Sequence, residues 1–600
     1  MIQIPEFIRK ATSFVRAQDG TIDPDDTLRI IVEWEGVKAS SRLINAGKRP
    51  QAVNEMVLFK GAWHYTEAAK FYGEGYSMLS QYGGTIGNPE LIGGYDDHLH
   101  YRLQTAEGYF TVYNMVLLSP NSDDCTLIGF SSCKRFTGEI RLADGHFEIV
   151  LNGEGLVIEP GESWELEQLV ILPGGQREEL LEYYAGLIAA NHPPLLVASV
   201  PNGWCSWYWF GPQVTEEDIY RNLNVIGQTV PKLQYIQIDD GYQAYMGDWL
   251  TPGRSFGNMQ GLCRQIRASG SEPAIWVAPF IAERNSSLLR DHPDWFVQDA
   301  QDGGPLASDT ISFGGWRNGP WYMLDGTHPE ARGYLRHVFK TMREEWGCRY
   351  FKLDANIWGA LPGGLRYNRQ ATKTEAYRLG MQAVFEGAGS DSFLLGCNAP
   401  MWPSLGTVHG MRVTGDIDRN WPTFASLAAE CFCRNWQHQR LWINDPDCIV
   451  LENRFPEADA EQAVATGIEP VTEQEFQFHM AYIVASGGMV LSGDDLTSMS
   501  ADNAAILRKA VAANHAAARF EDDRFRIGII KETDRQLICL FNWENDPISL
   551  SVQLDEPGRI VDYWNGEDYG EHLQQFTLEE LAPRSARVLE FTPLSLNRED

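Results

Sequence analysis

The sequence predicts a multidomain protein of α/β plus all-β class, with a central (β/α)8 barrel between an N-terminal β-sandwich and a small C-terminal β-sandwich. Two observations predict this class. The middle of the chain alternates short apolar runs with amphipathic helical segments, as eight-stranded parallel barrels do. Both ends consist of strand-like runs separated by turn residues. The predicted domains are residues 1–195, 196–515 and 516–600.

Length and composition agree with several large domains. The chain has 600 residues, whereas an ordinary domain has about 150 and a barrel of this kind about 250. Hydrophobic residues make up 44% of it, which is enough to build large cores and argues against bulk disorder.

The two flanking regions are expected to be antiparallel sandwiches. In the N-terminal region, the strand-like runs include residues 28–34, 110–118 and 147–151, bounded by Gly, Asn and Asp. In the C-terminal region, residues 537–543 and 586–591 repeat the pattern. Strands at this spacing are typical of a β-sandwich.

The middle region holds eight apolar runs, and most of them end in polar or aromatic residues. In such barrels the carboxyl ends of the strands form the active site, so these end residues are the candidates for chemistry. The alternative fold is a doubly wound sheet, which would need a Gly-rich phosphate turn near its first strand, and the sequence has none there. The predicted strands are residues 197–204, 233–239, 272–280, 349–354, 392–397, 410–416, 440–445 and 487–493, and predicted helices include 216–225, 259–268, 331–345 and 372–388.

Charge excludes two classes of partner. With 49 basic and 81 acidic residues, the formal net charge is −32, which argues against nucleic acid and against an anionic membrane surface. A neutral or cationic small ligand fits this charge better. The 19 Trp, 23 Tyr and 27 Phe include rings suited to line a pocket for a ringed ligand, although sheet cores account for most of them.

The sequence shows neither a targeting signal nor a metal-ligand spacing of cysteines. No stretch approaches the roughly 18 apolar residues of a membrane span, and the first ten residues lack an apolar signal region. A cytoplasmic location is therefore expected. The 10 Cys are scattered, with no metal-ligand or disulfide-rich spacing.

The run at 349–354 carries a candidate nucleophile. Side chains alternate along a strand, so Lys352 and Asp354 share a face. A neighbouring Lys keeps a carboxylate ionised, and an ionised carboxylate at a strand end can act as a nucleophile. The alternative is a structural ion pair inside the barrel.

A second carboxylate is Asp416, at the end of the run at 410–416. Two carboxylates about 5 Å apart are typical of a retaining glycosidase, and roughly 6.5–9.5 Å of an inverting one. The alternative is that Asp416 caps the next helix and that Asp418 is the second catalytic carboxylate.

The paired Asp239 and Asp240 follow another run and precede a Gly turn. Carboxylates accept hydrogen bonds from pairs of sugar hydroxyls, and they also bind divalent metals. Trp204 and Trp276 end two further runs and could stack on a sugar face, the alternative being that both rings belong to the core.

Together these residues resemble glycoside hydrolase family 36, the melibiase-type α-galactosidases, and the related family 27 of the same clan. The resemblance covers residues 195–510 in order. Its motifs are Asp239-Asp240, Gly247-Asp248-Trp249, Trp276, residues 324–330, Lys352-x-Asp354, Gly396-Cys397-Asn398-Ala399-Pro400, Arg412-x-x-x-Asp416 and residues 441–448.

The resemblance implies a retaining double displacement on a terminal α-galactosyl group, with no cofactor and no metal. Asp354 would be the nucleophile and Asp416 the acid/base. The other roles it implies are Asp239 and Asp240 at the 4- and 6-hydroxyls, Lys352 near the 3- and 4-hydroxyls, Arg412 near the 2-hydroxyl and Asp416, Cys397 beside the 2-hydroxyl, and Trp276 and Trp204 as walls.

Two segments depart from the family pattern. Where members often present a Trp from the N-terminal domain, this chain has Met78-Leu79 within residues 75–80. The loop at Cys397 reads Cys-Asn-Ala-Pro instead of the Gly-rich form of larger members, which bears on the 2-hydroxyl pocket.

The function expected is hydrolysis of small α-galactosides of the melibiose or raffinose type. The alternatives are an α-N-acetylgalactosaminidase, a galactosyl transferase of the raffinose-synthase kind, and a carbohydrate-binding protein with a degenerate barrel. The last would have lost Asp354 or Asp416, and both are present. The sequence does not determine the oligomeric state.

Overall fold

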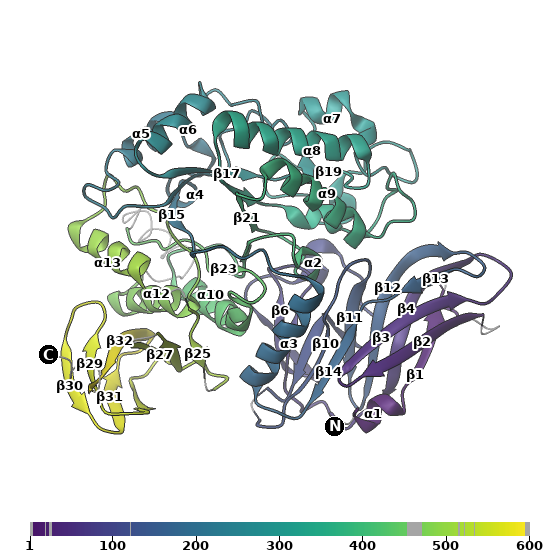
Figure 1. Cartoon of the computed structure of the whole chain (residues 1–600), viewed down its shortest axis with the longest axis horizontal. Helices are drawn as coiled ribbons and strands as arrows, with labels where there is room; N and C mark the ends of the chain where they lie inside the picture. The colour runs from purple at the N-terminus through teal and green to yellow at the C-terminus, as the bar shows by residue number, and fades with distance from the viewer. Residues whose placement is uncertain are drawn as a thin grey trace. The chain divides into compact units, whose positions relative to one another are not determined.

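The computed structural model describes residues 4–17, 20–22, 27–120, 122–452, 471–513, 516–520, 522–532 and 535–594. In this part of the chain, antiparallel sheets lie at both ends of the sequence and an eight-stranded parallel sheet with helices lies between them (Figure 1). The predicted fold class is confirmed.

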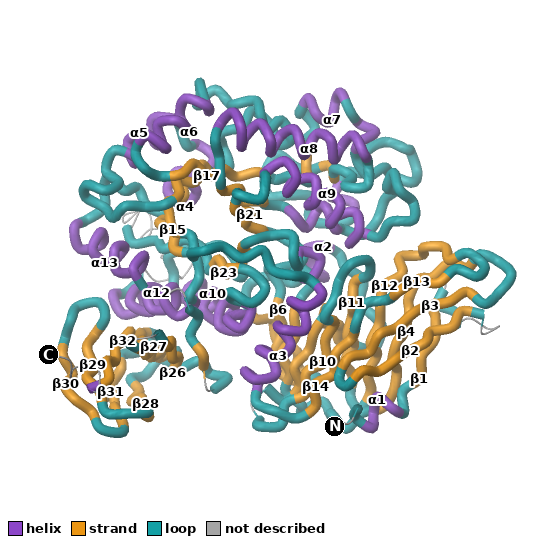
Figure 2. The backbone as a smooth tube through the Cα atoms, viewed as in Figure 1, coloured by secondary structure: helices purple, strands orange, loops and turns teal. Residues whose placement is uncertain are grey.

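The N-terminal region is a sandwich of two antiparallel sheets, and strands dominate it in Figure 2. Apolar side chains from both sheets, such as Met56 and Ile149 of one and Leu43 and Ile128 of the other, pack in one core. One described sheet has the order β1 (Thr12–Arg16), β4 (Gln51–Ala62), β12 (His146–Ile158), β11 (Thr137–Ala143), β8 (Phe110–Tyr113). The other has β13 (Ser163–Glu165), β3 (Lys38–Asn45), β14 (Leu169–Pro173), β10 (Thr126–Phe130), β9 (Met115–Leu118), β5 (Phe71–Glu74), β6 (Gln81–Thr85), β7 (Asn88–Ile92), with β2 (Leu28–Glu35) on β3.

The run predicted as one strand at 110–118 is two strands that belong to different sheets. The chain breaks at Asn114, whose φ of +64° lies in the left-handed region that Asn tolerates better than most residues. β8 pairs with β11 in one sheet, and β9 pairs with β10 in the other. A single residue therefore carries the chain across the sandwich.

All eight predicted barrel strands are present, each shorter than its predicted run. In the described residues they form one sheet in the order β23-β22-β21-β20-β17-β16-β15-β24. Beyond β23, an isolated parallel bridge joins Ile449 to Ser492 of β24. The strands are β15 (Asn202–Cys205), β16 (Tyr235–Ile238), β17 (Glu272–Val277), β20 (Tyr350–Leu353), β21 (Phe393–Gly396), β22 (Gly410–Arg412), β23 (Ile443–Asp445) and β24 (Val490–Ser492).

The four predicted helices form at the expected places. Two of them begin with a capping box: Thr215 with Asp218, and Thr372 with Glu375. The helices are α5 (Glu216–Leu223), α6 (Met259–Ala268), α8 (Pro329–Thr341) and α9 (Lys373–Ala388), and the region also contains α10 (Trp421–Arg434), α12 (Glu473–Ser486) and α13 (Ala501–Ala512). No helix in the described ranges is long and apolar enough to span a bilayer.

The C-terminal region is a second, smaller sandwich, as predicted. Side chains of both its sheets, including Leu540, Ile560, Val552 and Phe576, share one apolar core. Its described strands are β25 (Arg519–Phe520), β26 (Ile527–Lys531), β27 (Gln536–Asn542), β32 (Ser585–Pro593), β29 (Gly558–Asp562) and β30 (Asp568–His572) in one sheet, and β28 (Ile548–Gln553) with β31 (Gln575–Leu581) in the other.

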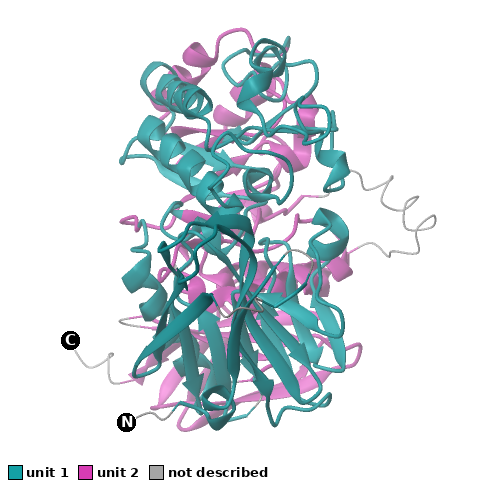
Figure 3. Cartoon of the chain, turned by 90° about the vertical axis from the view of Figure 1, so that its right-hand side faces the viewer, with its two compact units in different colours: residues 1–195, 243–254, 276–409 teal, residues 196–242, 255–275, 410–600 magenta. Residues whose placement is uncertain are grey.

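The chain divides into two compact units (Figure 3). Unit 1 contains residues 1–195, 243–254 and 276–409, and so includes β20 and β21 together with the N-terminal sandwich. Unit 2 contains residues 196–242, 255–275 and 410–600, with β15, β16 and β22 to β24. The domain boundaries expected near residues 195 and 515 stay predictions.

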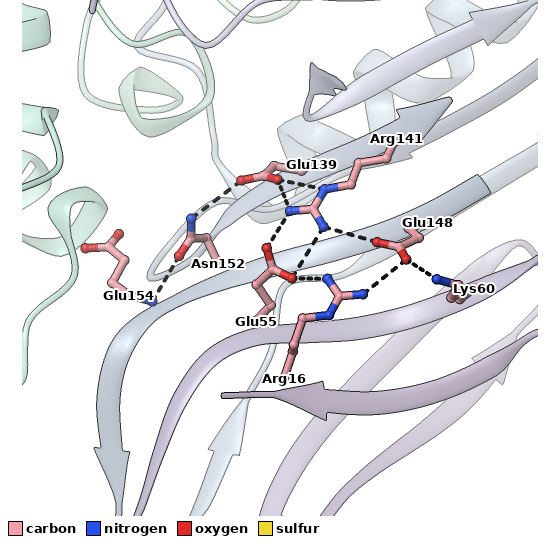
Figure 4. A network of polar contacts seen from close by, with 8 residues as sticks. All are labelled: Arg16, Glu55, Lys60, Glu139, Arg141, Glu148, Asn152 and Glu154. Carbon is pink, nitrogen blue, oxygen red and sulfur yellow. Dashed lines mark hydrogen bonds and ion pairs between the residues drawn. The ribbon is translucent and has the colours of Figure 1, made fainter. Parts of the chain in front are cut away.

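An ionic network lies across β1, β4, β11 and β12 of the N-terminal sandwich (Figure 4). Arg141, whose side chain is 5% exposed, pairs with Glu55 and Glu139 at 2.6 Å and with Glu148 at 3.1 Å. Arg141 stands directly opposite Glu148 in the ladder, and Glu148 opposite Lys60. The carboxylates thus neutralise a buried guanidinium that would be costly to leave alone.

Replacing Arg141 with Met is expected to lower the free energy of unfolding by about 3–5 kcal/mol, because it leaves the buried Glu139 without a cationic partner among the described residues. Glu55 and Glu148 lose one cation each but keep Arg16 and Lys60. Urea denaturation measures this loss of stability. As the control, Lys10→Met removes an exposed pair with Glu6, and should change stability by less than about 0.5 kcal/mol. An Arg141→Met protein as stable as the parent would contradict the argument.

The same network makes a pH prediction. Burial raises the pKa of Glu55, but the hydrogen bonds and charges of Arg141 and Arg16 together outweigh it, so this pKa lies below the ordinary value of 4.5. A lowered folded-state pKa contributes stability above the unfolded pKa, and that contribution is lost as the pH falls through the folded value. The stability difference between parent and Arg141→Met should therefore shrink below about pH 4.5.

Candidate active site

In unit 1, Asp354 follows the last residue of β20 and is 8% exposed. Its Oδ2 accepts a hydrogen bond from Trp276 Nε1 at 3.0 Å, and its Oδ1 accepts from Asn398 Nδ2 at 3.1 Å and from the backbone N–H of Ala355 at 2.7 Å. An ionised carboxylate only accepts hydrogen bonds, so these N–H donors match it and fix its orientation. The structure thus places Trp276 and Asp354 in contact.

The backbone around Asp354 is held in uncommon conformations. Ala355 has φ of +50° and Asn398 has φ of +42°, although neither is glycine. Each turn aims a donor at the carboxylate, and the two loops are joined by the Ile357 N–H donating to the Asn398 carbonyl at 2.6 Å. Left-handed non-glycine residues cost about 1–3 kcal/mol and concentrate at functional sites.

The other predicted residues of unit 1 lie on the same two strands. Lys352 is on β20 and is 6% exposed. Cys397 follows β21, is 3% exposed, and donates its backbone N–H to the Leu353 carbonyl at 2.7 Å. The Cys397 loop therefore runs beside Asp354.

Residues 75–80 of the N-terminal sandwich pack against these loops. Met78 donates its N–H to the Ala399 carbonyl at 2.9 Å, Met401 donates to the Tyr76 carbonyl at 2.9 Å, and Tyr76 Oη donates to the Ala360 carbonyl at 2.8 Å. The Asp97 carboxylate fastens the segment by accepting from the Tyr76 N–H at 2.7 Å. A side chain at Gly75 would meet Ser80 and Asp97 at 2.4–2.7 Å, so the tight turn requires glycine.

An aromatic cluster adjoins the same site. Trp358, four residues after Asp354, packs edge-on against Tyr101 at 5.8 Å, Phe313 at 5.5 Å and Trp316 at 5.9 Å between ring centroids. Burial raises the pKa of Tyr101, and the charges of Asp97 and Asp354 add to this. Phe313 and Trp316 are 39% and 38% exposed, so the cluster presents rings to solvent.

In unit 2, Asp239 and Asp240 follow β16 and are almost fully buried. Asp239 Oδ2 accepts from Gln237 Nε2 at 2.7 Å and from the Cys205 thiol at 3.4 Å. Gly241 makes the turn that follows, with φ of +128° and the backbone of Pro212 2.7 Å from where a Cβ would stand. Among the described residues, no group of three or more His, Cys, Asp or Glu could hold a metal ion.

Trp204 on β15 is completely buried and donates its Nε1–H to the Asp494 carbonyl at 2.7 Å. A ring without an accessible face stacks on neighbouring side chains and not on a ligand. This observation favours the core alternative for Trp204, and its role as a wall stays a prediction.

Arg412, at the end of β22, contacts Asp416, Asp447 and Tyr208 of unit 2. Its Nη2 lies 2.8 Å from Asp416 Oδ1, 2.5 Å from Asp447 Oδ2 and 3.0 Å from Tyr208 Oη. The side chains of Arg412 and Asp447 are 1% and 3% exposed, whereas that of Asp416 is 68% exposed. Tyr208 on α4 (Trp207–Phe210) also donates its hydroxyl hydrogen to Asp447.

The helix-cap alternative for Asp416 is wrong. The N-cap of α10 is Asn420, whose side chain accepts from the Thr423 N–H at 2.8 Å. Asp418 instead accepts from the Arg419 N–H and from the Asn420 side chain within that turn. Asp416 therefore contacts Arg412 and projects into solvent.

The sequence patterns predict no role for four residues that the structure brings into the site: Asn398, Tyr101, Tyr208 and Asp447. Asn398 and Asp447 were visible as polar residues after predicted strands, and that position was the available signal. Tyr208 lies in the aromatic run just after the predicted strand at 197–204, so its position was a signal too. Tyr101 had none, because its partners lie far away in the sequence. Their contacts depend on how distant segments meet.

The middle of the chain matches a known protein family. Residues 236–393, which include Asp239, Asp240, Trp276, Lys352 and Asp354, match the protein family Melibiase. This central part of the chain is therefore similar to the melibiase family. The prediction from the motifs is thus confirmed at the level of the family.

The curated relatives of this chain are distant. The chain is 28% identical over 160 residues to the myogenesis-regulating glycosidase of Mus musculus, covering 26% of this chain and 22% of that protein. It is 27% identical over 250 residues to the alpha-galactosidase AgaA of Geobacillus stearothermophilus, covering 38% and 32%. The chain thus spans less than a third of the length of either relative.

The fold also resembles a solved α-galactosidase. The structure of TtGalA from Thermus thermophilus, in complex with p-nitrophenyl α-D-galactopyranoside, superimposes with a TM-score of 0.62. The two chains are 20% identical, and the match covers 88% of this chain and 98% of that one. At this identity the likeness shows the fold alone.

Proposed function

We propose that this melibiase-family protein is a retaining α-galactosidase that removes terminal non-reducing α-D-galactosyl groups from small galactosides of the melibiose or raffinose type. The observation that carries the proposal is the setting of Asp354. This strand-end carboxylate lies in the segment that matches the melibiase family, and Trp276, Asn398 and Ala355 orient it.

Asp354 supplies the nucleophile. Its oriented oxygen forms a bond to the anomeric carbon of the galactosyl group while the bond from that carbon to the leaving oxygen breaks. Asp416 gives its proton to the leaving oxygen in this first step. In the second step Asp416 takes a proton from water, which attacks the anomeric carbon and releases Asp354.

The buried polar residues select the sugar. Asp239 and Asp240 accept hydrogen bonds from the 4- and 6-hydroxyls, Lys352 binds near the 3- and 4-hydroxyls, and Arg412 binds near the 2-hydroxyl. Cys397 lies beside the 2-hydroxyl, and the buried Trp276 orients Asp354 through its indole N–H. A site of buried acceptors rejects a sugar that leaves them unpaired, which is the basis for preferring an axial 4-hydroxyl.

A panel of p-nitrophenyl glycosides tests the function. The α-galactoside should be hydrolysed with a kcat/KM at least about 100-fold above that of the α-glucoside, because the latter leaves buried carboxylates unpaired. Proton NMR of the first-formed sugar should show the α-anomer, as retention requires.

Each alternative has its own result in this panel. A preference for the α-N-acetylgalactosaminide would move the function to that sugar with the same carboxylates. Galactosyl transfer to added sucrose in place of hydrolysis would indicate a transferase. Release of the β-anomer, or no activity on any of these substrates, would overturn the proposal.

A further inference from the structure

Asp416 and Asp447 share one nitrogen of Arg412. Nη2 lies 2.8 Å from Asp416 Oδ1 and 2.5 Å from Asp447 Oδ2. The two carboxylates differ sharply in environment, since Asp447 is buried and Asp416 projects into solvent. The Arg412 guanidinium thus pairs with the exposed carboxylate of Asp416 and with the buried carboxylate of Asp447.

This arrangement bears on how Asp416 can hold a proton. Arginine stays charged at every relevant pH, and a cation at hydrogen-bond distance stabilises the carboxylate form of its neighbour. A proton donor beside an unneutralised arginine would lose its proton too easily to protonate a leaving oxygen near neutral pH. A second carboxylate on the same guanidinium cancels that effect.

The structure holds Asp447 firmly in this place. Its Oδ2 accepts from the Ile417 N–H at 2.7 Å and from the Tyr208 hydroxyl, and its own N–H donates to Asp445 Oδ1 at 3.0 Å. Its backbone has φ of +75°, an uncommon value for a residue other than glycine. Such a conformation persists only where the surroundings impose it.

We propose that Asp447 is a positioning residue that neutralises Arg412 and thereby keeps Asp416 able to act as a proton donor. This inference rests on the acid/base role of Asp416 in the proposed function. It assigns to Asp447 no contact with the substrate.

The charges around Asp447 agree with this role. Burial raises the pKa of Asp447 to about 6, Arg412 lowers it, and the negative charges of Asp416 and Asp445 raise it. The titratable groups that face it are Arg412 on β22, Asp416 in the following loop, Asp445 on β23, Cys448 beside it, Tyr208 on α4 and Tyr482 on α12.

The test is the pH profile of Asp447→Asn, which keeps the shape of the side chain and removes its charge. Without that charge, the Arg412 guanidinium, 2.8 Å from Asp416, favours the carboxylate form of Asp416 more strongly, so fewer molecules hold the proton to be donated. The pH at which kcat/KM for melibiose falls on the basic side of the profile (the basic limb) should be lower by at least about one pH unit. At pH 7 the activity on melibiose should fall about tenfold, while 2,4-dinitrophenyl α-galactoside, whose leaving group needs no proton, should react almost as before.

Two further variants separate this role from a general loss of structure. Asp447→Glu restores the charge and should return the basic limb toward its original position. Asp494→Asn is the matched control, because Asp494 is also buried with a pKa near 6 but holds the N–H groups of Leu451 and Glu452 and does not contact Arg412. Its basic limb should not move.

A reciprocal measurement covers the case in which Asp447→Asn does not fold. Removing the charge of exposed Asp416 in Asp416→Asn should lower the pKa of Asp447, followed by carbon-13 NMR of aspartate-labelled protein. An unshifted limb in folded Asp447→Asn, or an unshifted Asp447 in Asp416→Asn, would overturn the inference. A wild type inactive on every α-galactoside would instead overturn the proposed function, so the two failures are distinguishable.

Discussion

Substitution of Asp354 by glycine is expected to lower kcat for p-nitrophenyl α-galactoside by more than about 10⁴-fold, because it removes the atom that attacks the anomeric carbon. Azide fills the space left by a missing carboxylate and should restore part of the activity. The product of this rescued reaction should be β-galactosyl azide, since a single displacement inverts the anomeric centre.

The control for this prediction is Asp391→Asn, which removes an exposed carboxylate from the turn before β21 in the same unit. Its kcat should stay within about twofold of the parent. If Asp354 formed only a structural ion pair with Lys352, Asp354→Gly would lose stability and azide would give no product. Full activity without Asp354 would exclude the proposed mechanism.

Substitution of Asp416 by asparagine is expected to have an effect that depends on the leaving group. For melibiose, kcat/KM should fall by about 10²–10⁴-fold, because the departing sugar oxygen needs a proton. For 2,4-dinitrophenyl α-galactoside, the loss should be less than about tenfold. The protein should remain folded, since the Asp416 side chain is 68% exposed.

Asp418→Asn is the matched control, because Asp418 is the neighbouring exposed carboxylate and contacts only its own turn among the described residues. It should leave both substrates unaffected. If Asp418→Asn lost melibiose hydrolysis and Asp416→Asn kept it, the acid/base role would belong to Asp418.

Asp354 and Asp416 could be predicted from the sequence because both follow short apolar runs. A strand buried in a parallel sheet has such a run as its sequence. The same reasoning found all eight strands of the central sheet. It also placed Asp239 and Asp240 before a glycine turn that the structure shows to require glycine. Each of these features depends on residues that are neighbours in the chain.

The residues that complete the site could not be predicted in this way. Tyr208 and Asp447 are 239 positions apart, and Tyr76 is 284 positions from the carbonyl it binds at Ala360. The sequence pattern predicts one strand through Asn114, although this residue carries the chain from one sheet to the other. No local pattern records such contacts.

By itself, the sequence determined the fold class, the order of strands and helices along the chain, and the strand ends at which Asp354 and Asp416 lie. The reason is that periodicity and turn residues act over a few positions. Only the tertiary structure decided which donors hold Asp354 and that Asp447 shares Arg412 with Asp416. Those contacts depend on how distant loops meet, and that follows from packing across the whole fold.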